Sequence, residues 1–208
     1  MELRVATDLP GEATRLFLET APRTVALSGG STPRATYEEL AKHPAAWERV
    51  EVFFGDERCV PPDDPASNFR MADETLLSHV PARAHPMTGC DPESYETELA
   101  SVFGPGVPAF DLIFLGLGED GHTASLFPGD PALEVTDRNV VLVERPDHRR
   151  MTLTYPVLNA AHLAVFLVSG AAKQQTLLEM LSASGIPAAG VRAERVVVLA
   201  DPEAVDAA

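Results

Sequence analysis

The glycine-rich segment from Gly116 to Gly129 contains the residues best suited to acid–base chemistry. It holds His122, preceded by Glu119 and Asp120, and it follows an apolar run of strand length. A histidine gains or loses a proton near neutral pH, and a neighbouring carboxylate can fix its tautomer. This arrangement predicts that His122 is a general base and that Asp120 supports it.

The same segment also admits a metal site or a covalent nucleophile, and the sequence favours neither. Asp120 and His122 are two potential metal ligands, but no cluster of histidines or cysteines elsewhere in the chain would complete a ligand set. The chain also lacks the Gly-x-Ser-x-Gly signature in which α/β-hydrolases present a nucleophilic serine. A general base acting on water is therefore the preferred interpretation, with no metal.

A second loop offers groups that bind anions. It leaves an apolar run and enters a segment of helical character, and it contains Gly29, Gly30, Ser31 and Thr32. Exposed backbone N–H groups at the start of a helix, together with hydroxyl groups, can form a cradle for a phosphate. An ordinary strand-to-helix turn with a serine or threonine cap would explain the same residues.

Charged residues follow two further apolar runs. Asp56 and Arg58 come directly after one run, and Lys173 follows another. Arg58 can hold a phosphate through two parallel hydrogen bonds, and Asp56 can orient that arginine or bind a sugar hydroxyl. A solvated loop with a local ion pair, and an exposed helix lysine, are the alternative interpretations.

The elements that must position these groups are short strands alternating with helices. Most of the apolar runs are continuously apolar, which is typical of a parallel sheet covered on both faces. Strands are expected at 24–28, 50–54, 110–115, 140–143, 163–168 and 196–199. Helices are expected to begin at Thr32-Pro33, at Ser67 or Asn68, at Asp91-Pro92 and after Gly170.

This alternation predicts right-handed βαβ units in a layered α/β domain spanning residues 1–208. In such folds, function resides in the loops that leave the carboxyl ends of the strands. The glycine-rich and charged motifs occupy these loops in the predicted order of elements.

Charge excludes several classes of partner. The chain of 208 residues has 16 basic and 31 acidic side chains, which gives a net charge of −15. Duplex nucleic acid and anionic membranes would repel such a surface, so neither is an expected partner. A phosphorylated ligand would have to rely on local donors.

Targeting signals and cysteine usage point to the cytoplasm. The N-terminus lacks the apolar core of a signal peptide, and no apolar run reaches the roughly 20 residues that span a bilayer. Cys59 and Cys90 are the two cysteines of the chain. We expect them to be free thiols in a reducing compartment, without a disulfide.

Taken together, the motifs resemble the 6-phosphogluconolactonase branch of the glucosamine-6-phosphate isomerase/6-phosphogluconolactonase family. The resemblance runs from about Val25 to Lys173, and the segment around His122 is its most specific part. The matching segments, in order, are 27–33, 55–62 with Ser67-Asn68, 116–129, 150–154, 158–160 and 166–173.

The resemblance implies a fold and an activity. The fold would be a Rossmann-like three-layer sandwich around a mostly parallel sheet, shared with glucosamine-6-phosphate deaminases and ribose-5-phosphate isomerases. The activity would be hydrolysis of 6-phospho-D-glucono-1,5-lactone to 6-phosphogluconate in the pentose phosphate pathway, without metal or organic cofactor.

The resemblance also implies roles for individual residues. His122 would be the general base, with Asp120 beside it. Arg58 and Lys173 would hold the phosphate, with Arg150 as a secondary contributor. Thr32 and Asp56 would line the substrate pocket.

Two other functions remain open. A glucosamine-6-phosphate deaminase would share several motifs, but those relatives usually carry Asp-Glu-Tyr where this chain has Asp56, Glu57 and Arg58. A sugar-phosphate-binding regulator without catalysis is the second alternative, and the pairing of Asp120 with His122 argues against it. We expect the protein to be a monomer or a weak homo-oligomer.

Overall fold

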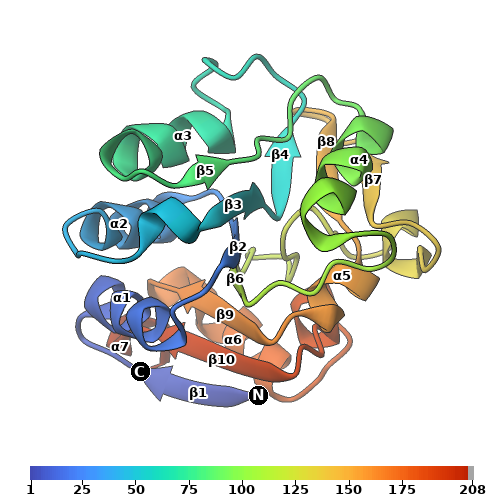
Figure 1. Ribbon diagram of the computed structural model, residues 1–208. Helices are drawn as coiled ribbons and strands as arrows, with labels where there is room; N and C mark the ends of the chain where they lie inside the picture. The colour runs from blue at the N-terminus through green and yellow to red at the C-terminus, as the bar shows by residue number, and fades with distance from the viewer. Residues whose placement is uncertain (206–208) are drawn as a thin grey trace.

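A parallel sheet of seven strands forms the centre of the computed structural model, which describes residues 1–205 (Figure 1). The strand order is β1-β10-β9-β6-β2-β3-β5, and every neighbouring pair is parallel. The strands are β1 (Glu2–Val5), β2 (Thr24–Leu27), β3 (Glu51–Phe54), β5 (Arg83–Ala84), β6 (Leu112–Gly116), β9 (Leu163–Val168) and β10 (Arg195–Ala200).

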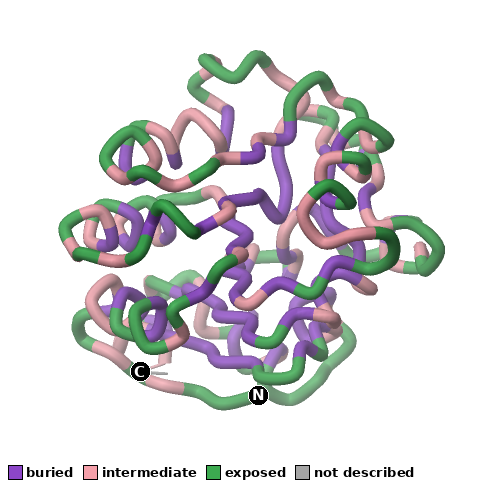
Figure 2. Tube along the Cα trace, in the orientation of Figure 1, coloured by how far each residue is buried: buried purple, intermediate pink, exposed green. Residues whose placement is uncertain are grey.

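Burial of the central strands explains their continuous apolar sequence. Every residue of β9 is buried, as are the first four residues of β6. Figure 2 shows buried chain concentrated along these strands and exposed chain on the surrounding helices. A strand covered on both faces has no polar side to alternate with, so the prediction of five of these strands from apolar runs is confirmed.

Helices cover both faces of the sheet. Right-handed crossovers place α1 (Leu9–Thr20), α2 (Ser31–Leu40) and α3 (Asn68–Thr75) on one face. They place α4 (Pro92–Phe103), α5 (Tyr155–Ala160) and α6 (Gln174–Leu181) on the other, and α7 (Pro202–Val205) follows β10. Figure 1 shows the first three helices together on one side and α4 and α5 opposite them. The predicted α/β sandwich around a mostly parallel sheet is confirmed.

The predicted helix starts are confirmed in three cases and wrong in one. Ser67 caps α3 by accepting a hydrogen bond from the Arg70 N–H group, and Asp91 caps α4 in the same manner. The helix expected to begin at Thr32-Pro33 begins at Ser31, with Gly30 as its N-cap. Gly30 has φ +113°, a conformation that favours glycine, so the chain turns earlier than a threonine cap would allow.

A second, antiparallel sheet packs beside the first and contains β4 (Asp56–Arg58), β8 (Arg150–Leu153) and β7 (Val140–Val143). The run at 140–143 was expected to join the parallel sheet, and that expectation is wrong. Leu142 at its centre is 39% exposed, which an interior strand of the parallel sheet would not allow. The pairing of β4 with β8 sets Arg58 directly opposite Arg150.

The central sheet changes winding direction between β6 and β2. The chain passes from β2 outward to β3 on one side, and from β6 to β9 on the other. Loops that leave the two neighbouring strands therefore diverge and leave a crevice at their carboxyl ends. None of the helices in residues 1–205 combines the length and apolarity required of a membrane span.

Cys59 and Cys90 form a disulfide, with Cα atoms 5.0 Å apart. The expectation of two free thiols was therefore wrong, and with it the argument from cysteine usage for a reducing compartment. The two residues are 31 positions apart in the sequence. The fold places the end of β4 beside the turn before α4, a proximity that no local pattern indicates.

We predict that breaking the disulfide destabilises the chain without unfolding it at room temperature. Closing a loop of this length restricts the unfolded chain by about 3–4 kcal/mol. The double variant Cys59→Ser/Cys90→Ser should therefore melt roughly 10 °C below the oxidised wild type in calorimetry. Wild type treated with dithiothreitol should melt at the same temperature as the variant. Equal melting temperatures for the oxidised and reduced wild type would show that the disulfide does not stabilise the chain.

Candidate functional site

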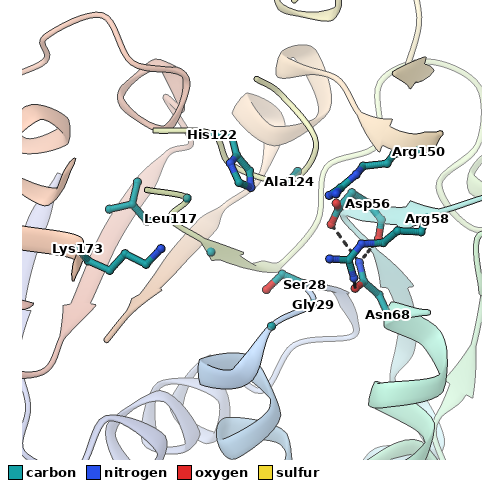
Figure 3. A pocket seen from close by; sticks show the side chains of 13 residues that line it. Ser28, Gly29, Asp56, Arg58, Asn68, Leu117, His122, Ala124, Arg150 and Lys173 are labelled. Carbon is teal, nitrogen blue, oxygen red and sulfur yellow. Dashed lines mark hydrogen bonds between the residues drawn. The ribbon is translucent and has the colours of Figure 1, made fainter. Parts of the chain in front are cut away.

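A cavity of about 230 Å³ opens at the carboxyl ends of the central strands (Figure 3). Seven of the ten predicted site residues line it, namely Gly29, Gly30, Asp56, Arg58, His122, Arg150 and Lys173. Asp120 does not line the cavity but is hydrogen-bonded to His122, and Ser31 and Thr32 are also outside the lining. The cavity also gathers residues that were not predicted, including Ser28, Asn68 and Leu117.

His122 is held by a hydrogen bond to Asp120. The distance from His122 Nδ1 to Asp120 Oδ1 is 2.5 Å, and the same oxygen accepts the His122 backbone N–H group at 3.1 Å. Burial disfavours the charged form of Asp120, but these hydrogen bonds outweigh it and lower the pKa of the carboxyl group. An ionised Asp120 accepts the proton on Nδ1 and leaves Nε2 as the basic nitrogen.

Gly118 makes this arrangement possible, because a side chain at that position would occupy the place of the imidazole. A Cβ atom on Gly118 would lie 2.1 Å from His122 Nδ1 and 2.7 Å from Asp120 Oδ1. The Gly118 N–H group also donates to the His122 carbonyl at 2.9 Å. Gly118 therefore contacts both the side chain and the backbone of His122.

Phe127 supports the other side of the histidine. The ring centroids of His122 and Phe127 are 4.4 Å apart. The guanidinium carbon of Arg145 lies 4.0 Å from the Phe127 centroid. Sequence reasoning missed both residues, because nothing in their spacing indicated that Phe127 packs on the histidine or that Arg145 packs on Phe127.

Asn68 joins the two charged residues of the next loop. Arg58 Nη1 donates to Asn68 Oδ1 at 2.5 Å, and Asn68 Nδ2 donates to the backbone oxygen of Asp56 at 2.9 Å. The Asp56 carboxylate accepts from Ser125 Oγ at 2.6 Å and is 6% exposed. Asn68 was predicted as a possible helix cap, and its role in orienting Arg58 is visible in the tertiary structure (Figure 3).

Glu57 fastens this loop to the start of α3. Its buried carboxylate accepts the backbone N–H groups of Arg58, Asn68 and Phe69 at 2.7–2.8 Å and the Ser67 hydroxyl at 2.9 Å. Burial raises the pKa of Glu57, and the four hydrogen bonds partly offset that shift. Because all four partners are donors, the side chain is bound as a carboxylate.

Lys173 and the start of α2 complete the cavity. Lys173 lies on one side, and Arg58 and Arg150 lie on the other (Figure 3). Among the described residues, no side chain caps α2 at Gly30, so its first N–H groups have no side-chain capping partner next to the cavity. Gly29 packs so closely on Asn68 that a Cβ atom would lie 1.9 Å from its Oδ1 atom.

The cavity is lined mainly by basic side chains, although the chain as a whole is acidic. Its described lining contains three basic side chains, Arg58, Arg150 and Lys173, against one carboxylate, Asp56, which is already hydrogen-bonded. Within residues 1–205 no cluster of three potential metal ligands is present. The arrangement is suited to binding a small anion beside a histidine base.

Comparisons with known proteins point in the same direction. The model of the family "Glucosamine-6-phosphate isomerases/6-phosphogluconolactonase" matches residues 2–199. A 6-phosphogluconolactonase of Synechocystis sp. is 47% identical over 186 residues, which cover 84% of this chain and 78% of that protein. The crystal structure of 6-phosphogluconolactonase from Thermotoga maritima superposes with a TM-score of 0.86 at 30% identity, covering 96% of this chain and 99% of the other.

A similar fold also occurs in an enzyme of different activity. A monomeric glucosamine-6-phosphate deaminase superposes with a TM-score of 0.83, covering 98% of both chains, at 21% identity. At that identity the likeness shows the shared architecture alone. It agrees with the sandwich fold expected from the sequence.

We predict that Glu57→Gln lowers the free energy of unfolding by about 2–3 kcal/mol. The substitution replaces one carboxylate oxygen by an NH2 group, whose hydrogens would face the donors that this oxygen now accepts. Urea denaturation followed by circular dichroism measures this change. The control Glu38→Gln alters a side chain 54% exposed, and its stability should stay within about 0.5 kcal/mol of the wild type. Equal effects of the two substitutions would show that the Glu57 hydrogen bonds contribute nothing specific.

Proposed function

The chain belongs to the glucosamine-6-phosphate isomerase/6-phosphogluconolactonase family, and we propose that it is a lactonase that opens 6-phospho-D-glucono-1,5-lactone to 6-phosphogluconate in the pentose phosphate pathway. The observation that carries this proposal is the His122–Asp120 pair beside a cavity with three basic side chains. A lactone is an activated ester, so one base and a set of hydrogen-bond donors are sufficient for its hydrolysis.

The proposed reaction begins with water at C1 of the lactone. His122 Nε2 takes a proton from the water as its oxygen attacks C1, and Asp120 stabilises the resulting imidazolium. Backbone N–H groups of the glycine-rich loops stabilise the negative charge on the former carbonyl oxygen. When the ring C–O bond breaks, the imidazolium returns the proton to the ring oxygen, so His122 is regenerated.

Phosphate binding orients the lactone in the cavity. Arg58 and Lys173 approach the cavity from its two sides, and we assign the phosphate to them, with Arg150 contributing beside Arg58. The N–H groups at the start of α2 add donors without adding formal charge. Interactions with a phosphate remote from C1 place the reacting carbon at the histidine.

The remaining features are proposed with the function. We propose that residues 1–208 act as a single domain, of which 206–208 lie outside the described residues. The protein would work in the cytoplasm as a monomer or weak homo-oligomer, without a cofactor and without binding nucleic acid. A glucosamine-6-phosphate deaminase activity is less favoured, because the cavity has Arg58 where those relatives usually carry a tyrosine.

His122→Ala should lower kcat by about 10²–10⁴-fold with little change in KM, because the base acts in the chemical step. The measurement is hydrolysis of freshly prepared lactone above its spontaneous rate, coupled to oxidation of the product. The same preparations should release no ammonia from glucosamine 6-phosphate. Wild-type ammonia release without lactone opening would replace the proposed function with the deaminase.

Arg58→Ala should act mainly on KM, raising it roughly 10–100-fold, because a charged hydrogen bond to phosphate is worth about 1.5–3 kcal/mol. The control is Arg83→Ala, an arginine 71% exposed outside the cavity, for which KM should not change. A drop in kcat at constant KM would remove Arg58 from the phosphate site.

Gly118→Ala should impair catalysis by displacing the imidazole, because the added methyl group overlaps His122 Nδ1. We expect kcat to fall at least tenfold, in the range that misplacement of a reacting group produces. Gly129→Ala is a comparison in the same segment: a Cβ atom there meets nothing within 4 Å, so the change should lower stability through the positive φ of +74° but leave the imidazole in place. Full activity of Gly118→Ala would mean that the loop tolerates a different histidine position.

A further inference from the structure

A second cavity, of about 370 Å³, lies at the amino ends of β2 and β3, at the opposite edge of the sheet from the catalytic cavity. One wall is the chain that joins α1 to β2, and the other is the chain that joins α2 to β3. Its floor is apolar and includes Phe17, Leu18 and Val50. The volume falls within the range of about 300–1,000 Å³ that is typical of small-molecule sites.

Two arginines at this cavity differ from the other arginines of the chain. Of the fourteen arginines, eleven bond a carboxylate, an amide or a backbone carbonyl, and Arg145 lies over Phe127. Among residues 1–205, the side chains of Arg23 and Arg49 have no such partner. Both line this cavity, and its described lining contains no acidic side chain.

The absence of partners is informative because the chain is strongly acidic. Acidic residues outnumber basic ones by 31 to 16, so most guanidinium groups find a carboxylate nearby. Arg23 and Arg49 reach the same cavity from separate connections and bring two positive charges to an apolar floor. A guanidinium with all of its donors free is suited to bind a carboxylate or a phosphate.

We propose that this cavity binds a small amphipathic anion, that is, a carboxylate or phosphate attached to an apolar body. The head group would bond to Arg23 and Arg49, and the body would pack against Phe17, Leu18 and Val50. The volume fits a body of roughly ten to fifteen non-hydrogen atoms. An inorganic ion would leave the apolar floor uncovered, and a neutral molecule would leave both guanidinium groups unpaired.

The packing behind the floor favours a preformed site. Phe17 is 2% exposed and stacks on Trp47, with ring centroids 4.9 Å apart, and Trp47 is 3% exposed. The floor is therefore the edge of the hydrophobic core and does not depend on mobile side chains. A ligand on this floor does not have to order the floor before binding, which limits the entropic cost of association.

The test uses naphthoate, naphthyl phosphate and uncharged naphthalenemethanol as probes, titrated by isothermal calorimetry into the full chain. In an Arg58→Gln/Lys173→Gln background, which removes the phosphate ligands of the catalytic cavity, the two anions should bind at one site, and naphthalenemethanol and inorganic phosphate should bind there at least about tenfold more weakly. Comparison of the two anions identifies the preferred head group. Equal binding of naphthalenemethanol, or no saturable binding of either anion, would overturn the proposal.

Variants locate the site. The double variant Arg23→Gln/Arg49→Gln should weaken naphthoate binding at least about tenfold, and Leu18→Asp should do the same by placing an acid in the lining. Arg83→Gln/Arg149→Gln removes two positive charges from exposed side chains outside both cavities, so it is the matched control for net charge and should leave binding unchanged. Arg58→Gln should also leave it unchanged, and loss of binding in that variant would place the probe in the catalytic cavity and overturn the proposal.

Folding of the variants is checked independently. Arg23 and Arg49 are exposed residues outside the catalytic cavity, so the double variant should keep wild-type lactonase activity and melting temperature. Binding that is lost in the double variant while both properties are kept assigns the effect to the two guanidinium groups. Naphthoate binding that persists in both the double variant and Leu18→Asp would reject the site.

Discussion

Strand β6 pairs in parallel with β2 on one side and with β9 on the other, and this pairing determines the positions of the loops that form the cavity. The connections that follow β2 and β6 wind in opposite directions, so their loops separate and open a crevice at the carboxyl ends of the strands. The loop after β6 brings His122 to this crevice, the loop after β2 brings Gly29 and Gly30, and the extension of β3 into β4 brings Arg58. Each functional group is therefore fixed by a buried strand.

Two buried carboxylates hold the loops that carry Arg58 and His122 in fixed positions. Glu57 accepts four hydrogen bonds that join the Arg58 loop to α3, and Asp56 accepts the Ser125 hydroxyl from the loop that carries His122. Their donors are largely withdrawn from water, so breaking any one of these bonds would leave a buried polar group unpaired. The positions of the arginine and of the histidine are thereby coupled through the same network.

Charge is distributed unevenly over an acidic molecule. Three basic side chains gather at the cavity that contains His122, and two arginines whose side chains have no partner among residues 1–205 gather at the cavity on the opposite edge of the sheet. The two sets lie at opposite ends of the same strands. Anionic groups would thus meet favourable potential at two separate places on a surface that otherwise repels them.

The sequence by itself determined the α/β architecture, most of the strands, three helix starts and seven of the ten residues predicted for the cavity. These follow from local rules, because buried strands are apolar, helix caps are polar, and the predicted site residues come directly after strands. Tertiary structure alone decided that residues 140–143 pair antiparallel in a second sheet, and that Cys59 meets Cys90. It also decided that Asn68 orients Arg58 and that Phe127 supports His122. Such contacts join segments whose proximity depends on how the strands and helices pack, and no short-range pattern of residue types records that packing.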